Sequence, residues 1–130
     1  MTQVVDQIQQ RRQDWVARVE ALANEISQWA GAQGWRVERS SKTIEEDALG
    51  TYQVPTLHII RPGGELVLNP VALHVIGSDG RVDLEAFPTL ARVKLCGGGG
   101  GWRIMTDSNV PLRQPWDAKT FVQLADDLLS

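Results

Sequence analysis

The alternation of apolar and polar residues is clearest in the first third of the chain. Apolar side chains recur there every seven positions, which places them on one side of an α-helix, and the remaining positions are mostly polar. Asp6 and Gln9 have the spacing of a capping box, and Gly31 and Gly34 are typical of a helix end. The pattern predicts one long amphipathic helix over residues 1–34, with the apolar stripe Ile8, Trp15, Leu22 and Trp29.

Such a helix is long for its domain. Roughly 28 helical residues extend about 42 Å, whereas a chain of 130 residues folds to a radius of gyration of about 14 Å. Either the helix bends over its own core, or its first turns reach a partner. The seven-residue recurrence suits a pair of helices, so a homodimer is the second interpretation.

Residues 54–87 carry the strongest strand pattern of the chain, VPTLHIIRPGGELVLNPVALHVIGSDGRVDLEAF. The segments 62–65 (PGGE) and 78–81 (SDGR) place glycine where a hairpin turn needs a positive φ. We therefore predict three antiparallel strands joined by two tight turns.

The two faces of this predicted sheet differ. One is apolar along its length and is expected to lie against the helices: Val54, Ile60, Val67, Val71, Leu73, Val75, Leu84 and Ala86. The other has acidic residues at one end and four large aliphatic side chains at the other: Leu57, Ile59, Leu66 and Leu68. Because an uncovered sheet face is normally polar, these four predict a second cover, a curled sheet, a groove or a subunit contact.

The flanking segments complete the sheet. An edge strand is predicted over residues 35–40, followed by a polar connection over 41–50. Further strands are predicted over 90–95 and 102–105, on either side of a run of five glycines. That run lacks the phosphate-binding patterns GxxxxGK[ST] and GxGxxG, so we interpret it as a flexible hairpin loop.

The last segment predicts a helix with Asp117 as its N-cap, and with Trp116 and Phe121 at the positions of a hydrophobic staple. The fold prediction is a single α+β domain. Its parts are a long N-terminal helix (1–34), an antiparallel five- or six-stranded meander sheet (35–106), and a crossover with a C-terminal helix packed on one sheet face (107–130).

Composition and charge restrict the class of protein. The net charge is −3, so a nucleic-acid binder with a basic face is not expected. Cys96 is the single cysteine, which excludes an internal disulfide and a cysteine-based zinc site. The N-terminal segment lacks the apolar core of a signal peptide, and no apolar run approaches the ~18 residues of a membrane span. We expect a cytoplasmic protein that binds neither nucleic acid nor membrane.

Both histidines lie in the central strands and are candidate ligand-binding residues, because imidazole commonly binds metals and haem iron. In the expected register His58 faces Asn69 and His74 faces Glu85. The two rings then lie roughly 16 Å apart on opposite faces, which argues against a shared metal ion. No cofactor is predicted, and haem bound by one histidine is the alternative.

His74, Asp83 and Glu85 form the candidate catalytic or metal-binding cluster. In the predicted register Asp83 lies diagonally from His74, within reach of a shared cation. A cross-strand salt bridge accounts for the same residues, so no catalytic residue is assigned.

The segment Gly80-Arg81-Val82-Asp83-Leu84, followed by Val93-Lys94, resembles the core motif of the PD-(D/E)xK nucleases. In that family an aspartate on one strand, and an acidic residue and a lysine on the next, hold a divalent cation. Arg92 stands where the acidic residue belongs, and the glycine run replaces the helix that would follow. The resemblance therefore implies at most an inactive relative.

The leading functional prediction is a non-enzymatic cytosolic interaction module that forms a homodimer or binds another protein. Its interaction surface would comprise Leu57, Ile59, Leu66, Leu68 and Trp102. The alternative is a small-molecule or haem-binding domain with a pocket between sheet and helix that uses His58 or His74. The third prediction is a metal-assisted hydrolase based on His74, Asp83 and Glu85.

Overall fold

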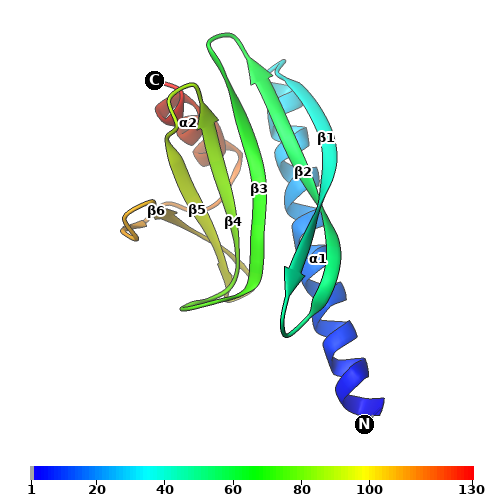
Figure 1. The fold of residues 1–130 in the computed structure, drawn as a ribbon. Helices are drawn as coiled ribbons and strands as arrows, with labels where there is room; N and C mark the ends of the chain where they lie inside the picture. The colour runs from blue at the N-terminus through cyan, green and yellow to red at the C-terminus, as the bar shows by residue number, and fades with distance from the viewer. Residues whose placement is uncertain (1) are drawn as a thin grey trace.

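The computed structural model describes the backbone of residues 2–130 and the side chains of residues 4–130. The fold is α+β, with a helix at each end of the chain and an antiparallel sheet between them (Figure 1). The elements are α1 (Thr2–Ala32), β1 (Arg36–Glu46), β2 (Gly50–Arg61), β3 (Gly64–Val75), β4 (Ser78–Phe87), β5 (Arg92–Gly98), β6 (Gly101–Thr106), β7 (Pro111–Leu112) and α2 (Ala118–Leu128). The strands follow one another in chain order, β1-β2-β3-β4-β5-β6-β7. The fold class is confirmed, with seven strands where five or six were expected.

The sheet is larger than predicted at both of its edges, where one strand is longer and one strand is added. Residues 41–46, expected as part of a polar connection, continue β1 and pair with the first half of β2, so that Glu46 stands opposite Gly50. At the other edge, β7 forms within the expected crossover and pairs with Ile104 and Met105 of β6. Edge strands tolerate polar residues because one side of the backbone faces solvent. This tolerance explains why hydrophobic alternation did not reveal the added length.

Both central turns differ from the predicted ones. Arg61 pairs with Gly64 and Val75 with Ser78, so the turns lie at residues 62–63 and 76–77. Gly80 is inside β4, where an added Cβ would overlap the Trp15 ring of α1. Gly80 is thus needed for the close approach of α1 to the sheet and not for a turn.

These shifts change the expected pairs. His58 faces Val67 and not Asn69. His74 faces Asp79 and not Glu85, because the turn after β3 lies at residues 76–77 and not at 79–80. An irregularity between Pro70 and Ala72 shifts the register by one further residue. Such a bulge changes the alternation of side chains along a strand, so the two halves of β3 present different residues to the same face.

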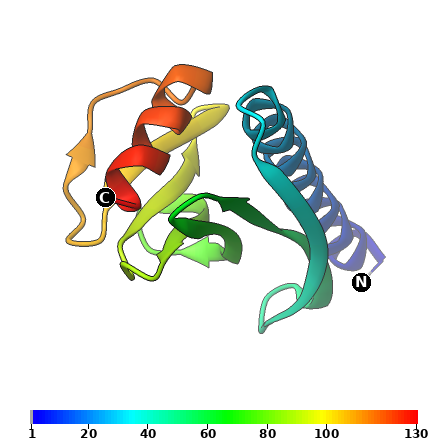
Figure 2. The same ribbon diagram turned by 90° about the horizontal axis from the view of Figure 1, so that it is seen from above.

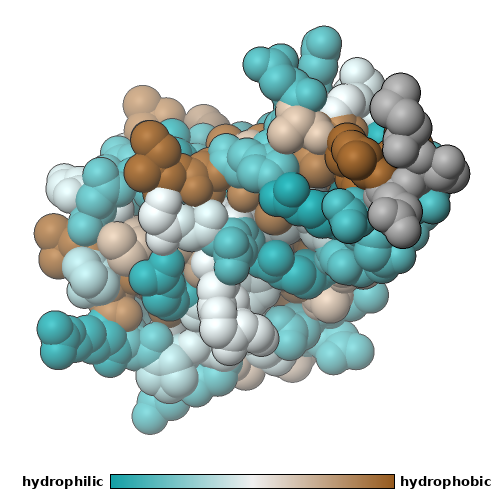
Figure 3. Space-filling view, turned by 90° about the horizontal axis from the view of Figure 1, so that it is seen from below, coloured by the Kyte–Doolittle hydropathy of each residue, from teal (hydrophilic) through white to brown (hydrophobic). Residues whose placement is uncertain are grey.

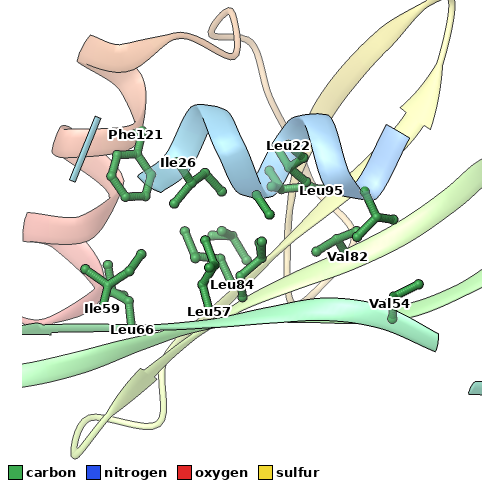
Figure 4. Packing of buried hydrophobic residues seen from close by; sticks show 14 of the residues in the cluster. Leu22, Ile26, Val54, Leu57, Ile59, Leu66, Val82, Leu84, Leu95 and Phe121 are labelled. Carbon is green, nitrogen blue, oxygen red and sulfur yellow. The ribbon is translucent and has the colours of Figure 1, made fainter. Parts of the chain in front are cut away.

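Along the second half of β2 and the first half of β3, the helices therefore cover the face opposite to the one predicted. The four aliphatic residues expected on the uncovered face, Leu57, Ile59, Leu66 and Leu68, each have 0% exposure and form the core beneath the helices. Figure 4 shows Leu57, Ile59 and Leu66 packed towards Ile26 of α1 and Phe121 of α2. Ile60 and Val67, expected in the core, are half-buried on the other side. The prediction for Val54, Leu84 and Ala86 is confirmed, since all three are buried.

α1 covers the sheet with its central and C-terminal turns. Trp15 and Leu22 of the predicted stripe are buried, and Ile8 and Trp29 pack at its margins. The first turns extend beyond the sheet, where Val4 and Val5 are 58% and 53% exposed (Figure 1). The helix therefore stays unbroken and overhangs its own core, as its length requires.

α2 begins as predicted. Asp117 is its N-cap and accepts a hydrogen bond from the Thr120 amide at 2.8 Å, while the Trp116 and Phe121 rings pack edge to face. Its buried residues include Phe121, Leu124, Ala125 and Leu128. Seen from above, the strands curl into a trough with α1 and α2 on the same side (Figure 2).

The face seen from below is mainly hydrophilic, with hydrophobic residues in groups mainly in its upper half (Figure 3). Among the described residues, no helix combines the length and apolarity required to cross a bilayer.

Candidate functional site

The sheet face opposite the helices carries a charged cluster centred on Asp83. Arg81 donates two hydrogen bonds to the Asp83 carboxylate, at 2.7 and 2.9 Å, and Arg92 lies 3.5 Å from it. Asp83 is only 2% exposed. A buried carboxylate held by two guanidinium groups is compensated in charge, which fits a structural ion pair better than a general base.

Neighbouring side chains extend this cluster across the sheet. Asn69 accepts a hydrogen bond from Lys42 at 2.8 Å and donates one to Glu85 at 3.2 Å. Lys94, which is 9% exposed, donates to Asn109 at 2.7 Å. Burial lowers the pKa of Lys42, although the nearby Glu85 and Asp83 carboxylates partly oppose that shift. Most polar groups on this face therefore already have partners within the chain.

The predicted cluster of His74, Asp83 and Glu85 is not assembled. Asp83 and Glu85 share the outer face of β4, but His74 lies near the end of β3 beside α1 and β1. Its ring nitrogens lie 2.6 Å from Arg11 and 3.7 Å from Glu46. The expected His74–Glu85 pair is wrong because the β3–β4 turn lies three residues earlier than expected, which places His74 opposite Asp79.

Glu46 links α1 to the edge of the sheet. Trp15 donates its indole N–H to the Tyr52 hydroxyl at 3.0 Å, and Tyr52 donates to Glu46. The backbone amides of Leu73 and His74 also donate to Glu46, at 3.1 and 3.0 Å. Burial raises the pKa of Glu46, but these hydrogen bonds outweigh it and hold the pKa below its ordinary value. Burial, together with Glu46, raises the pKa of Tyr52.

His58 is separated from His74, as the sequence predicted. It lies on the outer face and pairs with Glu65 at the start of β3. Among the described residues, no group of three His, Cys, Asp or Glu side chains is placed to hold a metal ion. The candidate haem role of either histidine stays a prediction.

The residues that resemble the nuclease motif are neighbours in space. Asp83 stands opposite Lys94 in the β4–β5 register, and Arg92 contacts Asp83 from the same face. Arg92 occupies the position where the family motif has a second carboxylate. It supplies a positive charge instead, which neutralises Asp83. This arrangement opposes cation binding at Asp83.

A different site lies between α1 and the β5–β6 hairpin. Arg18 of α1 stacks over Trp15 and Trp102, with its guanidinium carbon 5.2 and 5.4 Å from the two ring centroids. It also donates to the backbone carbonyl of Asp79. An added Cβ at Gly97 would overlap Arg18. The same Cβ would overlap the backbone carbonyl of Asp79, so Gly97 lets both Arg18 and β4 lie close to β5.

Beside this stack is a groove of about 590 Å³. Its α1 side is formed by Arg18, Ala21, Leu22 and Glu25, and its other side by Gly100, Gly101, Trp102 and Trp116. Among the described side chains, the indole nitrogen of Trp116 is the one buried polar atom without a hydrogen-bond partner.

The sequence singled out two residues of this groove. Trp102 was predicted in an interaction surface with Leu57, Ile59, Leu66 and Leu68, which lie in the core instead. Trp116 was predicted only in a helix staple, and Arg18 was assigned no role. The spacing of tryptophans along the chain does not indicate that α1 and the crossover meet at β6, so this assembly depends on the tertiary fold.

Comparisons with known proteins identify no relative. No family model matches the chain, and neither a curated protein nor a solved structure does so.

Proposed function

We propose that this protein is a non-enzymatic binding module whose recognition site is the groove between α1 and the β5–β6 hairpin. The observation that carries the proposal is the pair of half-buried tryptophans, Trp102 and Trp116, in a groove of about 590 Å³. Ligand sites are typically concave and mostly apolar, with a few polar groups that orient the ligand. Arg18 and Glu25 supply such groups here.

The state of the charged side chains supports a binding role over a hydrolytic one. Asp83 is occupied by Arg81 and Arg92, and Glu85 by Asn69. A general base must be free to accept a proton from a substrate within hydrogen-bond reach. The groove is also larger than the hollow beside His74, which has a volume of about 320 Å³.

The test is a screen of a small-molecule fragment library by amide and indole chemical shifts of the ¹⁵N-labelled protein. Binding in the groove is expected to shift the signals of Gly100, Gly101 and the Trp102 indole together. Trp102→Ala should abolish the shifts of Gly100 and Gly101. Trp35→Ala, which changes a half-buried tryptophan that does not line the groove, should retain them. Hits that avoid the groove, or that persist in Trp102→Ala, would overturn the proposal.

A homodimer is the second candidate, and the exposed first turns of α1 favour it. Val4 and Val5 lie beyond the sheet, where they have little of their own core to cover them. Light scattering after size exclusion should show a mass near twice 14.4 kDa, and Val4→Glu with Val5→Glu should restore the monomer. A monomeric wild type at high micromolar concentration would remove this candidate.

A further inference from the structure

One edge of the sheet is incomplete beside the groove. β5 pairs with β6 from Gly101 to Thr106, whereas β7 pairs only with Ile104 and Met105. Along the described chain, the stretch from Gly101 to Arg103 therefore has a strand partner on one side only. Its backbone N–H and C=O groups on the other side are available to a further strand.

This free edge coincides with one wall of the groove. Gly101 and Trp102 belong to both, and α1 forms the opposite wall through Arg18, Ala21 and Glu25. The glycines of the hairpin leave the approach open, since an added Cβ at Gly100 or Gly101 would meet no atom within 4 Å. A backbone can therefore come close to β6 at this point.

The polar groups at the groove match the chemistry of a polypeptide. A peptide presents donors and acceptors alternately along an extended backbone, as the edge of β6 does. The carboxylate of the exposed Glu25 favours a basic side chain.

We propose that the groove binds an extended peptide segment, which adds to β6 as a further strand of the sheet, with a basic residue facing Glu25. The free edge accommodates about three residues, or about 10 Å of strand. Strand addition gives affinity through main-chain hydrogen bonds, and the side-chain pockets give specificity. This inference rests on the proposed function and names the class of ligand for the same groove.

The other sheet edge is a weaker candidate for such a ligand. β1 is long, but it carries a charged side chain at nearly every other position, including Arg36, Glu38 and Lys42. Charged side chains on an edge strand discourage pairing with other chains. β6 instead offers Trp102 beside glycines.

The experiment selects ligands from a phage-displayed library of random twelve-residue peptides and synthesises the strongest binder. Calorimetry should give a dissociation constant near the micromolar range, weakened at least about ten-fold by Trp102→Ala and little changed by Trp35→Ala. Because Trp102→Ala also removes contact with Trp15, Glu25→Lys provides a second variant at an exposed position. It should weaken a basic peptide several-fold without lowering the melting temperature.

Backbone N-methylation then separates strand addition from other modes of binding. Methyl groups at alternate peptide residues should each weaken binding about ten-fold or more, and those at the intervening residues should have little effect. A peptide that needs Trp102 but shows no alternation would overturn strand addition and leave groove binding intact. Selected peptides that are all insensitive to Trp102→Ala and Glu25→Lys would overturn the peptide inference. In that case, the fragment screen decides the proposed function separately.

Discussion

The two faces of the sheet are both buried along β4 and β5, but by different means. On the inner face Val82, Leu84 and Leu95 have 0% exposure because the helices pack over them. On the outer face Asp83 and Lys94 are almost equally buried, although both helices lie on the other side. Their cover consists of neighbouring charged side chains and of contacts from the turn after β6.

This difference indicates separate physical roles for the two faces. Burial of apolar area contributes roughly 25 cal/mol per Å², so the inner face supplies most of the stabilising free energy. A buried ion pair gains little net free energy, because desolvation offsets the attraction between the charges. Removal of one partner is costly, however, so the outer face is sensitive to any single loss. Four predictions test this comparison.

The largest effect is expected on the inner face. Leu68→Ala should lower the free energy of unfolding by about 2–5 kcal/mol, because it leaves a cavity beneath the helices. The matched control is Val67→Ala, one residue away on the half-buried outer face, where about 1 kcal/mol is expected. Urea denaturation at neutral pH measures both. Equal losses would show that the two faces do not differ in packing.

The second-largest loss of stability is expected when the Asp83 carboxylate is removed. Asp83→Ala leaves Arg81 and Arg92 without their shared partner and should cost about 2 kcal/mol, below the full penalty for a buried pair because both arginines are partly exposed. The control is Asp107→Ala, which removes an exposed carboxylate that pairs with Arg92 and should change stability little. If both variants unfold at the same urea concentration as the wild type, the cluster is not coupled to folding.

A pH-dependent effect is expected where α1 joins the edge of the sheet. The pKa of Glu46 lies below its ordinary value in the folded protein, so ionised Glu46 contributes stability above its unfolded-state pKa. That contribution is lost as the pH falls through the lower folded-state pKa. Glu46→Gln should therefore destabilise most at neutral pH, and the difference from wild type should narrow towards about pH 3.

Urea denaturation of both proteins across that range measures the effect. Glu45→Gln, at the exposed neighbouring position, is the control and should follow the wild type. A constant difference between Glu46→Gln and wild type at every pH would contradict this prediction.

The smallest effect is expected at the histidines. The side chains of His58 and His74 are 42% and 38% exposed. The His58–Glu65 pair lies at the surface, and the His74–Glu46 contact is long at 3.7 Å, so neither pair contributes much. His58→Ala and His74→Ala should each change stability by less than about 0.5 kcal/mol. Thermal melting measures this, and haemin absorbance on the same variants tests the haem alternative. A Soret shift that is lost with one histidine would assign it as a haem ligand.

The local elements of the chain were predictable from short-range patterns. The seven-residue spacing from Ile8 to Trp29 identified α1, and the cap at Asp117 with its staple identified α2. These features depend on helix geometry and on neighbouring residues alone. The hairpin order of the central strands was also predicted, although both turns lie at other residues than expected.

The positions that required the tertiary structure all depend on contacts between distant segments. Gly80 reads as a turn residue in the sequence, but it lies within β4 because the Trp15 ring occupies the space of its Cβ. The irregularity after Pro70 reversed the expected roles of the leucine face and the Ile60–Val67 face. Because side chains alternate with a period of two, one bulge moves every later residue to the other side.

The candidate groove shows the same division. The sequence determined that Trp102 follows a flexible glycine run, and that Arg18 lies on a helix. Only the tertiary structure brought Arg18 onto Trp102, left Gly101–Arg103 without an outer strand and placed Trp116 beside them. Helices and turns are set by interactions within a few residues, whereas a groove forms where the packing of distant segments ends.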